Sequence, residues 1–269
     1  MLTFSKYQGA GNDFVLVDAR HESFEPLRER VAALCDRHRG IGADGLMMLE
    51  DDAQSLFRMR YFNADGGEAT MCGNGGRCIA LFAHHLGIGG LHKVFRGMDG
   101  LHTADLLSVD EAGTGATVAL GMIDVSRVDR LGNSYFLNTG SPHYVEFVQE
   151  LDRLDVKTRG AQLRHDQRFA AGGGTNVNFV EWVSDGHIRV RTFERGVEDE
   201  TLACGTGATA AVLAAVLDRG SRLSQFRVDV PGGTLGVRFA AHHEDTFTGI
   251  VLTGPARKVF DGKIDANFL

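Results

Sequence analysis

The chain has 269 residues, 43% of them hydrophobic, which is enough to bury one large core or two medium ones, and the length favours two domains. Its 35 glycines against only 4 prolines indicate many tight turns in an ordered protein. Because the net charge is −7, the start lacks a basic region followed by an apolar stretch, and no apolar run approaches ~20 residues, we expect no nucleic-acid partner, no secretion signal and no membrane span.

Strand-like runs separated by turn signals occupy most of the chain. They are expected at Phe14–Asp18, Leu46–Glu50, Phe57–Phe62, Thr117–Leu120, Tyr144–Val148, Val177–Val183, Ile188–Phe193, Phe226–Val230, Leu235–Phe239 and Phe247–Leu252. The expected helices are Leu27–Arg37, Arg77–Leu86, a short polar one near Glu150–Leu154, and Ala208–Leu217. Because the strands outnumber the helices, the pattern predicts an α+β fold.

Two of these helices follow near-copies of one short phrase, Glu68–Gly75 and Glu200–Gly207. Each phrase places Glu four residues before Cys and continues Cys-Gly-x-Gly, with Cys72 and Cys204 almost half a chain apart. A thiol at a helix start faces unpaired first-turn amides and the positive end of the helix dipole, which favour its thiolate. A single such cysteine is more often a small buried hydrophobe, but the repetition favours a shared function.

The duplication extends beyond the cysteines. An Arg-rich run precedes each phrase, at Arg58–Asn63 and at Arg189–Glu194, and the polar turn Gly11–Val15 has a counterpart in Gly140–Val145. We therefore expect two copies of one α+β unit that face each other, with the equivalent loops meeting at their interface.

The expected domains are residues 1–122, carrying Cys72 and possibly completed by the C-terminal strand, and residues 123–269, carrying Cys204. One thiol from each half suits a nearly symmetric reaction, in which a thiolate removes a proton from one face of a carbon and a thiol returns one to the other. The developing enediolate would be stabilised by the amides of Gly73–Asn74 and Gly205–Thr206. Nothing in the sequence requires a cofactor or a metal for this reaction.

Further polar residues lie in the same loops. His143 and Glu194 are expected to tune thiol protonation or to hold a substrate ammonium group, and Arg195 suits a bidentate grip on a second carboxylate. Asn12, Asn63 and Asn176 are neutral polar residues in Gly-rich loops, where they act either as turn formers or as substrate ligands.

With these motifs the chain closely resembles the diaminopimelate epimerases. The resemblance covers essentially the whole length, through Gly9–Phe14, Gly40–Gly45, Phe62–Gly66, Met71–Arg77, Gly140–His143, Asn176–Phe179, Glu194–Gly196 and Ala203–Gly207. It implies two pseudo-twofold related domains, each a mixed β-sheet wrapped around a central helix, with the active site in the interdomain cleft. It also implies interconversion of LL- and meso-2,6-diaminoheptanedioate in lysine and peptidoglycan precursor synthesis, without metal or pyridoxal phosphate.

The resemblance also implies roles for individual residues. Cys72 and Cys204 match the acid/base pair, and His143 with Glu194 matches the pair thought to modulate the thiols. The positions that match substrate-binding residues are Asn12, Asn63, Gly73, Asn74, Asn176, Glu194, Arg195, Gly205 and Thr206. Ser141 stands where Asn is common in the family and is included because a hydroxyl can donate and accept a hydrogen bond. Gly45, where some members have Gln, is not included.

Other classes of function stay open at this point. A sister isomerase would act on another amino acid, a thiol redox protein would pair Cys72 with Cys204 as a disulfide, and a zinc site would have to use the pairs His84-His85 and His242-His243. Four cysteines without small-domain disulfide spacing indicate a reducing compartment, and we expect a cytoplasmic protein with Cys35 and Cys78 as core thiols. A homodimer is possible on general grounds.

Overall fold

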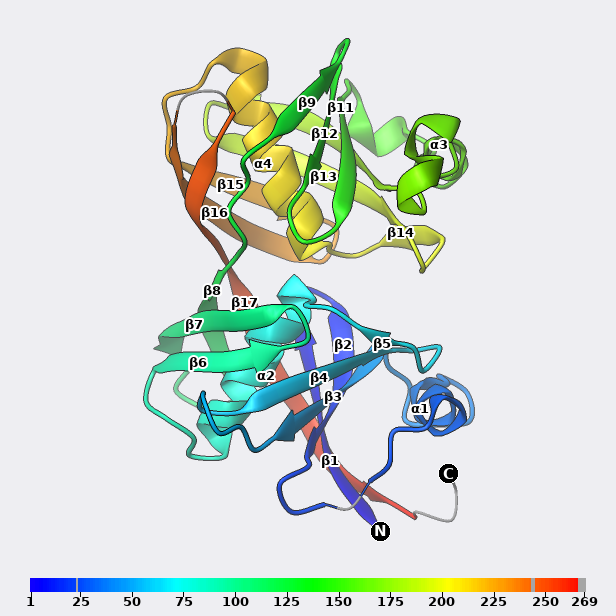
Figure 1. The fold of residues 1–269 in the computed structure, drawn as a ribbon, viewed down its shortest axis with the longest axis vertical. Helices are drawn as coiled ribbons and strands as arrows, with labels where there is room; N and C mark the ends of the chain where they lie inside the picture. The colour runs from blue at the N-terminus through cyan, green and yellow to red at the C-terminus, as the bar shows by residue number, and fades with distance from the viewer. Residues whose placement is uncertain (23, 243–244, 266–269) are drawn as a thin grey trace. The chain divides into compact units, whose positions relative to one another are not determined.

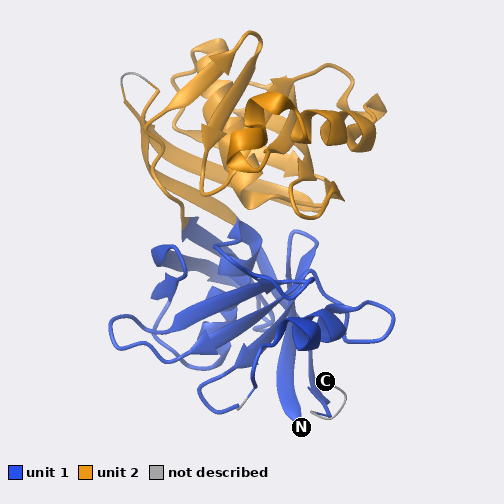
Figure 2. Cartoon of the chain, turned by 45° about the vertical axis from the view of Figure 1, so that its right-hand side comes forward, with its two compact units in different colours: residues 1–120, 254–269 blue, residues 121–253 orange. Residues whose placement is uncertain are grey.

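A computed structural model describes residues 1–22, 24–242 and 245–265 of the chain. The chain divides into two compact units, residues 1–120 with 254–269, and residues 121–253 (Figure 2). The division falls at 120/121 rather than at 122/123, and the last segment groups with the first unit, which is the arrangement considered above for the C-terminal strand. The physical reason is that the final strand, β17 (Phe247–Ile264), pairs with strands of the first unit from Gly254 onward.

The first unit is a mixed sheet that closes around a buried helix. Its other strands are β1 (Leu2–Gly9), β2 (Asn12–Asp18), β3 (Gly45–Glu50), β4 (Arg58–Asn63), β5 (Glu68–Ala69), β6 (His92–Gly97), β7 (Gly100–Val109) and β8 (Gly115–Gly121). β2 and β3 are parallel, and most other neighbouring strands are antiparallel. Because β17 pairs with both β8 and β1, the sheet closes on itself. Helix α2 (Gly73–His85) packs on β1, β2, β3 and β7, and its stretch from Cys78 to Ala83 is buried.

The second unit repeats this plan. Its strands are β9 (Val128–Leu131), β10 (Ser134–Asn138), β11 (Pro142–Phe147), β12 (Asn176–Ser184), β13 (His187–Glu194), β14 (Asp199–Thr201), β15 (Gln225–Val230), β16 (Gly233–Ala241) and the first part of β17. β11 and β12 are parallel, as β2 and β3 are. Helix α4 (Gly205–Arg219) is buried from Gly207 to Val216, and Figure 1 shows it enclosed by the strands of its unit.

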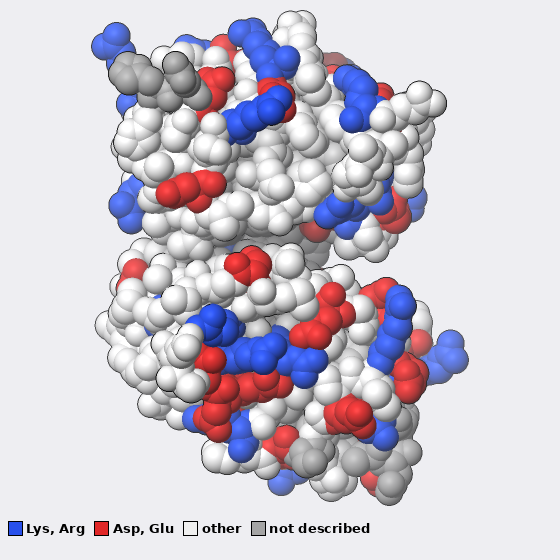
Figure 3. Space-filling model, in the orientation of Figure 1, with Lys and Arg blue, Asp and Glu red and all other residues white. Residues whose placement is uncertain are grey.

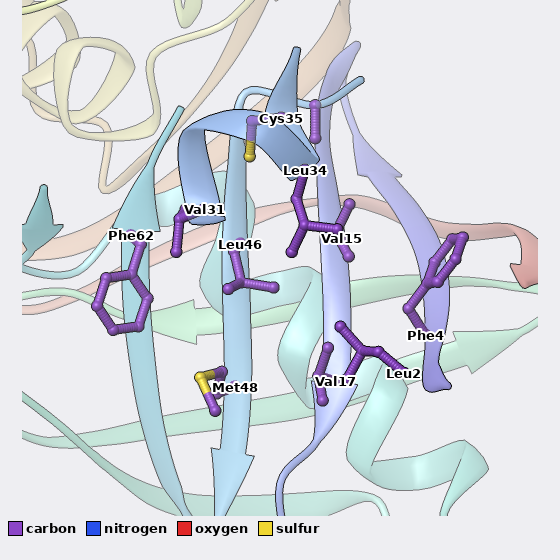
Figure 4. Close-up of a cluster of buried hydrophobic side chains, with 11 residues drawn as sticks. Leu2, Phe4, Val15, Val17, Val31, Leu34, Cys35, Leu46, Met48 and Phe62 are labelled. Atoms are coloured by element: carbon purple, nitrogen blue, oxygen red, sulfur yellow. The ribbon is translucent and has the colours of Figure 1, made fainter. Parts of the chain in front are cut away.

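A second, shorter helix covers the outer face of each sheet. In the first unit α1 (Arg28–Cys35) connects β2 to β3, and Figure 4 shows its Val31 and Leu34 directed at Val15 and Leu46. In the second unit the 3-10 turns η1 (Leu151–Arg153) and η2 (Gln167–Gly172) flank α3 (Val156–Arg164). These elements pack on β12 and β13 through a cluster that includes Val156, Phe169 and Phe179.

All ten expected strands overlap observed ones, and the α+β class and the paired architecture are confirmed. The expected helix near Glu150–Leu154 is wrong, because that segment forms only a 3-10 turn and the α-helix begins at Val156. The two central helices begin earlier than expected, at the residue after each cysteine, because the glycines of their first turns allow close packing against the sheet. The strands missed are β1, β5, β6, β7, β9, β10 and β14.

Charged side chains on the surface occur mostly in pairs of opposite sign. On the face of the first unit that Figure 3 draws, basic and acidic side chains lie side by side. Arg60 contacts both Glu50 and Glu68, and Arg96 contacts Asp52. Among the described residues, no helix is both long enough and apolar enough to cross a membrane.

Candidate active site

Cys72 is the N-cap residue of α2 in the first unit. Its backbone is extended, with φ −103° and ψ 124°, and its carbonyl oxygen accepts the first helical hydrogen bond from Gly76 N at 2.7 Å. The N–H groups of a helix's first turn have no acceptor inside the helix, so those of Gly73 and Asn74 are donors for an anion at this end. A Cβ at Gly75, in the first turn of the helix, would lie 1.7 Å from Met47 Cε, the end of a flexible side chain on β3.

Asn12 lies against the sulfur of Cys72. A two-residue turn, Ala10 with φ 54° and Gly11 with φ 86°, reverses the chain from β1 into β2 and presents Asn12 at the first position of β2. Asn12 Oδ1 accepts a hydrogen bond from Cys72 Sγ at 3.6 Å and another from Asn74 Nδ2 at 3.3 Å. Asn12 Nδ2 donates to Asp44.

Asp44 belongs to a cluster of charges below this turn. Arg37 donates to Asp44 Oδ1 at 2.6 Å and to both carboxylate oxygens of Asp13 at 2.7 and 3.1 Å. Lys6 also contacts Asp13, at 2.8 Å. Burial would raise the pKa of Asp13, but the hydrogen bonds from Arg37 and Lys6 outweigh it and lower the pKa to about 2. The lowered pKa keeps Asp13 ionised, and its ion pairs hold the turn beside Cys72.

Arg77, one turn into α2, is fully buried. Its guanidinium donates to Gly73 O at 3.1 Å, Asn74 Oδ1 at 2.7 Å and Pro255 O at 3.2 Å. Burial lowers the pKa of this guanidinium, and the nearby Cys78 and Cys72 sulfurs act in the opposite direction. Arg77 therefore binds the helix start to β17 and fixes the side chain of Asn74.

Cys204 is the N-cap residue of α4 in the second unit. Its sulfur accepts a hydrogen bond from Gly207 N at 3.4 Å and lies 3.4 Å from Thr206 Oγ1. Gly207 is needed here, because a Cβ would lie 2.4 Å from Asn178 Oδ1 and 3.2 Å from the sulfur. The carbonyl of Thr206 is held by Thr139 Oγ1 at 2.9 Å. Both expected helix-start cysteines are thus observed.

His143 is a neutral imidazole whose tautomer is set by its neighbours. Burial, reinforced by the charge of Arg195, lowers the pKa of His143 to about 3. Asn178 Nδ2 donates to Tyr144 O at 3.0 Å, which fixes the orientation of its amide, and contacts His143 Nδ1 at 3.1 Å. Nδ1 is therefore the acceptor and Nε2 carries the proton. That Nε2 is buried and finds no hydrogen-bond partner among the described residues.

The remaining residues expected in the second unit lie around Asn176. Its Nδ2 donates to Ser141 Oγ at 2.9 Å and to Pro142 O at 3.1 Å, and its Oδ1 accepts from Arg195 N at 2.9 Å. The Arg195 side chain reaches Gly172 O at 3.2 Å. Glu194, at the end of β13, accepts a hydrogen bond from Thr201 Oγ1. These contacts bring Ser141, Asn176 and Arg195 together, with Glu194 beside them in the chain.

Asn63 stands apart from the Cys72 cluster. It is the last residue of β4 and is exposed, and its register partner Gly45 follows Asp44 in the chain. No hydrogen bond of its side chain is found among the described residues.

The glutamate shared by the two cysteine phrases is structural. Glu68 forms a bidentate pair with Arg60, with distances of 2.7 and 3.0 Å, and Glu200 forms the same pair with Arg191, both at 2.6 Å. Each pair ties the loop before a cysteine to the Arg-rich strand of its unit. Asp44, Arg77 and Asn178 also belong to the site, although they were not predicted from the sequence. All three lie within the family motifs, where a charged or amide side chain in an otherwise apolar or Gly-rich segment could have identified them.

The residues named for the alternative chemistries are placed as follows. All four cysteines are free thiols, and Cys35 and Cys78 are buried. Within residues 1–22, 24–242 and 245–265, no group of three or more His, Cys, Asp or Glu side chains could hold a metal ion. His243, part of one histidine pair considered for zinc, lies outside these residues.

Comparison with known proteins agrees with this arrangement. The sequence profile of a family described as diaminopimelate epimerase matches residues 4–100 and 135–259. A diaminopimelate epimerase from Flavobacterium psychrophilum is 44% identical over 260 residues, covering 96% of this chain and 98% of the relative. One from Chlorobaculum tepidum is 45% identical over 262 residues, covering 95% and 98%.

Solved structures with low sequence identity share the fold. A PhzF-family phenazine biosynthesis protein from Bacillus anthracis superimposes with a TM-score of 0.74 at 13% identity, covering 98% of this chain and 99% of the other. A probable proline racemase from Agrobacterium radiobacter gives a TM-score of 0.71 at 14% identity, covering 99% and 93%. The profile match and the full-length relatives together show that the chain belongs to the diaminopimelate epimerase family.

Proposed function

We propose that this chain is an isomerase that interconverts LL- and meso-2,6-diaminoheptanedioate by moving a proton at one α-carbon. The named relatives support the substrate, and the reaction would serve lysine and peptidoglycan precursor synthesis in the cytoplasm. The observation that carries the mechanism is that each unit places one cysteine at the N-cap of its buried central helix.

In the proposed reaction the two thiols act on opposite faces of the α-carbon. One sulfur, as thiolate, takes the α-proton, and the other, as thiol, delivers its proton to the opposite face, which inverts the centre. The α-carboxylate gains charge as the enediolate forms, and the first-turn amides after Cys72 and Cys204 would stabilise that charge. In this scheme the amides stabilise the carbanion electrostatically, as a cofactor would in other enzymes.

The neighbouring polar groups would bind the rest of the substrate. Arg195 suits a carboxylate because a guanidinium can donate two parallel hydrogen bonds. Asn63 offers a free amide, and Ser141 with Asn176 forms a fixed polar edge next to Arg195. His143 would act as an Nε2–H donor, because its Nδ1 is occupied and burial keeps it neutral. Glu194, an acceptor, suits the substrate ammonium.

The test is proton exchange with solvent. Purified, reduced enzyme in deuterium oxide should introduce deuterium at the α-carbon of LL- and meso-diaminopimelate, followed by NMR or mass spectrometry. Cys72→Ala and Cys204→Ala should each lower the epimerisation rate by about 10² to 10⁴, the usual contribution of a general acid or base. Cys35→Ala, which changes a buried thiol in the α1 cluster, is the matched control and should keep full activity.

Two outcomes would contradict the proposal. Normal epimerisation by either cysteine variant would remove the two-thiol mechanism. Turnover of proline or glutamate in preference to diaminopimelate would instead identify a different amino acid as the substrate.

We also propose that the enzyme is a homodimer. Apolar side chains are exposed along β6 and β7 and the turns beside them, and a second copy would bury them: Leu91, Met98, Leu101, Leu107 and Val109. Light scattering of the pure protein should give twice the mass of the chain, and Leu107→Asp should reduce it to a monomer.

A further inference from the structure

Two amide side chains, Asn74 and Asn12, connect a buried cation to an anion in the first unit. Arg77 Nη2 donates to Asn74 Oδ1 at 2.7 Å, Asn74 Nδ2 donates to Asn12 Oδ1 at 3.3 Å, and Asn12 Nδ2 donates to Asp44 Oδ2. Asp44 is itself anchored, by Arg37 at 2.6 Å and by the Asp13 N–H at 3.1 Å.

The ends of this chain of hydrogen bonds determine its direction. A guanidinium can only donate and a carboxylate can only accept. Asn74 must therefore turn its oxygen to Arg77, and Asn12 must turn its nitrogen to Asp44. The orientation of each amide therefore follows from the chemistry of its partner.

This direction has a consequence for Cys72. The atom of Asn12 that lies 3.6 Å from Cys72 Sγ is its oxygen, which already accepts from Asn74. Only a protonated thiol can donate to that oxygen, and a thiolate there would face a second negative atom. The contact therefore favours the thiol at Cys72.

Cys204 has the opposite surroundings. Its sulfur accepts the N–H of Gly207 at 3.4 Å, and the hydroxyl of Thr206, also at 3.4 Å, is free to donate to it. Hydrogen bonds donated to a sulfur favour its charged form. The two helix starts thus present the same residue with opposite hydrogen-bond polarity.

We propose that Asp44 and Arg77 are positioning residues that hold the Asn74–Asn12 amide pair in this direction, so that the substrate-free enzyme carries its shared proton on Cys72 and a thiolate at Cys204. This deepens the proposed function and depends on it for the pairing of the thiols. In the first turnover the substrate's α-proton passes to Cys204 and the Cys72 proton passes to the other face of the carbon. The enzyme then holds the thiol at Cys204 and the thiolate at Cys72.

The charged and titratable groups around Cys72 pull in both directions. Arg77 and Cys78 lie on its own helix, Asp13 on β2, and Asp44 with Arg37 in the loop before β3. Asp99, paired with His102, accepts the Met71 N–H beside it. The charge of Arg77 favours a thiolate at Cys72, whereas the hydrogen bond to Asn12 favours the thiol. The hydrogen bond has the larger effect in this proposal because Asn12 contacts the sulfur directly. In the second unit, Asn178 lies beside Gly207 and contacts His143, which burial keeps neutral.

The wild-type enzyme provides the first test. Freshly reduced protein is treated with iodoacetamide at a series of pH values, and the modification of each cysteine is followed by peptide mass spectrometry. Cys204 is only 8% exposed and Cys72 is more exposed, so absolute rates depend on access, whereas the pH midpoint of each rate reports the thiolate. The midpoint of Cys204 should lie about one pH unit below that of Cys72, the shift that one ordinary hydrogen bond produces. A midpoint of Cys72 at or below that of Cys204 would overturn the proposal.

Asp44→Asn tests the positioning role. An amide at this position can donate as well as accept, so Asn12 is free to turn its nitrogen towards Cys72. The midpoint of Cys72 should fall by about one pH unit, while that of Cys204 stays in place. Asp13→Asn is the matched control, because it removes one negative charge from the same cluster without contacting the Asn12 side chain.

An equal shift of the Cys72 midpoint in both variants would show an effect of charge alone and would overturn the positioning role. Circular dichroism checks that the variants fold, and the wild-type midpoints remain decisive if one does not. Failure of the proposed function is seen separately, as absent deuterium exchange, because alkylation needs no turnover.

Discussion

Cys72 and Cys204 begin equivalent helices but lie in polar surroundings of different kinds. Beside Cys72 the turn is held by charges, with Asp13 and Asp44 against Arg37. Beside Cys204 the corresponding loops are held by neutral groups, the amides of Asn176 and Asn178 and the uncharged His143.

The strand register shows that these positions correspond. Gly45 pairs with Phe14 in the first unit as Val177 pairs with Tyr144 in the second, so Asp44, just before β3, and Asn176, the first residue of β12, take the same place in the register. Five residues after each cysteine the first unit has Arg77 and the second has Thr209, and both are fully buried. The two units thus share a cysteine at the helix start and differ in the polar groups that surround it.

The largest difference between the two units is expected when the buried residues Arg77 and Thr209 are substituted and the loss of stability is compared. Arg77→Met leaves three oxygens without their donor and should lower the free energy of unfolding by about 3 kcal/mol. Thr209→Val removes one hydroxyl that donates to Gly205 O at 3.0 Å and should cost about 1 kcal/mol or less. Urea denaturation measures both values, and similar losses would show that the Arg77 contacts add nothing to stability.

Alanine at the third residue of each central helix, Gly75 or Gly207, should lower kcat/KM to different extents. In Gly207→Ala the new Cβ meets Asn178 Oδ1, which Thr192 holds at 3.0 Å, so Cys204 must move; a displacement of 1 Å typically lowers kcat/KM about 10²-fold. In Gly75→Ala the Cβ meets the end of the flexible Met47 side chain, and the loss should be much smaller. Steady-state kinetics measures kcat/KM for both variants. A larger loss in Gly75→Ala than in Gly207→Ala would contradict the predicted contacts.

Between about pH 6.5 and pH 4, acid should weaken the second unit more than the first, in which burial also lowers the pKa of His85. Burial, with the charge of Arg195, lowers the pKa of His143 to about 3, so as the pH falls the unfolded chain takes up a proton on this residue first. Its contribution is complete above about pH 6.5 and is lost below it. The contribution of Asp13, whose pKa is about 2 because its cationic partners outweigh burial, is complete above about pH 4 and is lost between pH 4 and 2.

Within its window each contribution changes by about 1.4 kcal/mol per pH unit. Amide hydrogen exchange in β3 and β12, followed between pH 7 and pH 4, measures the two units separately. Loss of protection in β3 first, or in both strands together, would contradict this assignment. His21→Asn changes an exposed histidine of the first unit and should leave both profiles unchanged.

Substitution of Glu68 or Glu200, the glutamates of the two cysteine phrases, should lower the stability of the protein by similar amounts. Glu68→Gln and Glu200→Gln each weaken one partly exposed bidentate pair with arginine, and each should lower the free energy of unfolding by less than about 1 kcal/mol. Differential scanning calorimetry should detect small, equal shifts, and unequal ones would show that the two pairs are not equivalent.

Much of this fold follows from local pattern in the sequence. The ten expected strands were readable because apolar residues alternate or cluster between turn signals, and the internal repeat located both helix starts. Helix α3 was missed because only Val156 and Gly160 are buried, which leaves no apolar stripe. The second half of β17 was missed because Gly254, Pro255 and Gly262 interrupt the strand pattern.

The site was predictable in its residues but not in their hydrogen bonds. Cys72, Cys204 and their glycine neighbours stand out by repetition. The partnership of Asp44 with Asn12, or of Arg77 with Pro255, joins segments far apart in the chain and depends on tertiary packing. The direction in which an amide points cannot be obtained from sequence, because it is set by partners that only the fold brings together.

The path of β17 has a consequence for how the protein is made. The second unit is one continuous segment, residues 121–253, whereas the first needs residues 254–264 to pair with β8 and β1 and to supply the Pro255 carbonyl to Arg77. During translation the first unit therefore cannot close its sheet between β8 and β1 until the second half of β17 has left the ribosome. The half that is synthesised first is the last to be finished.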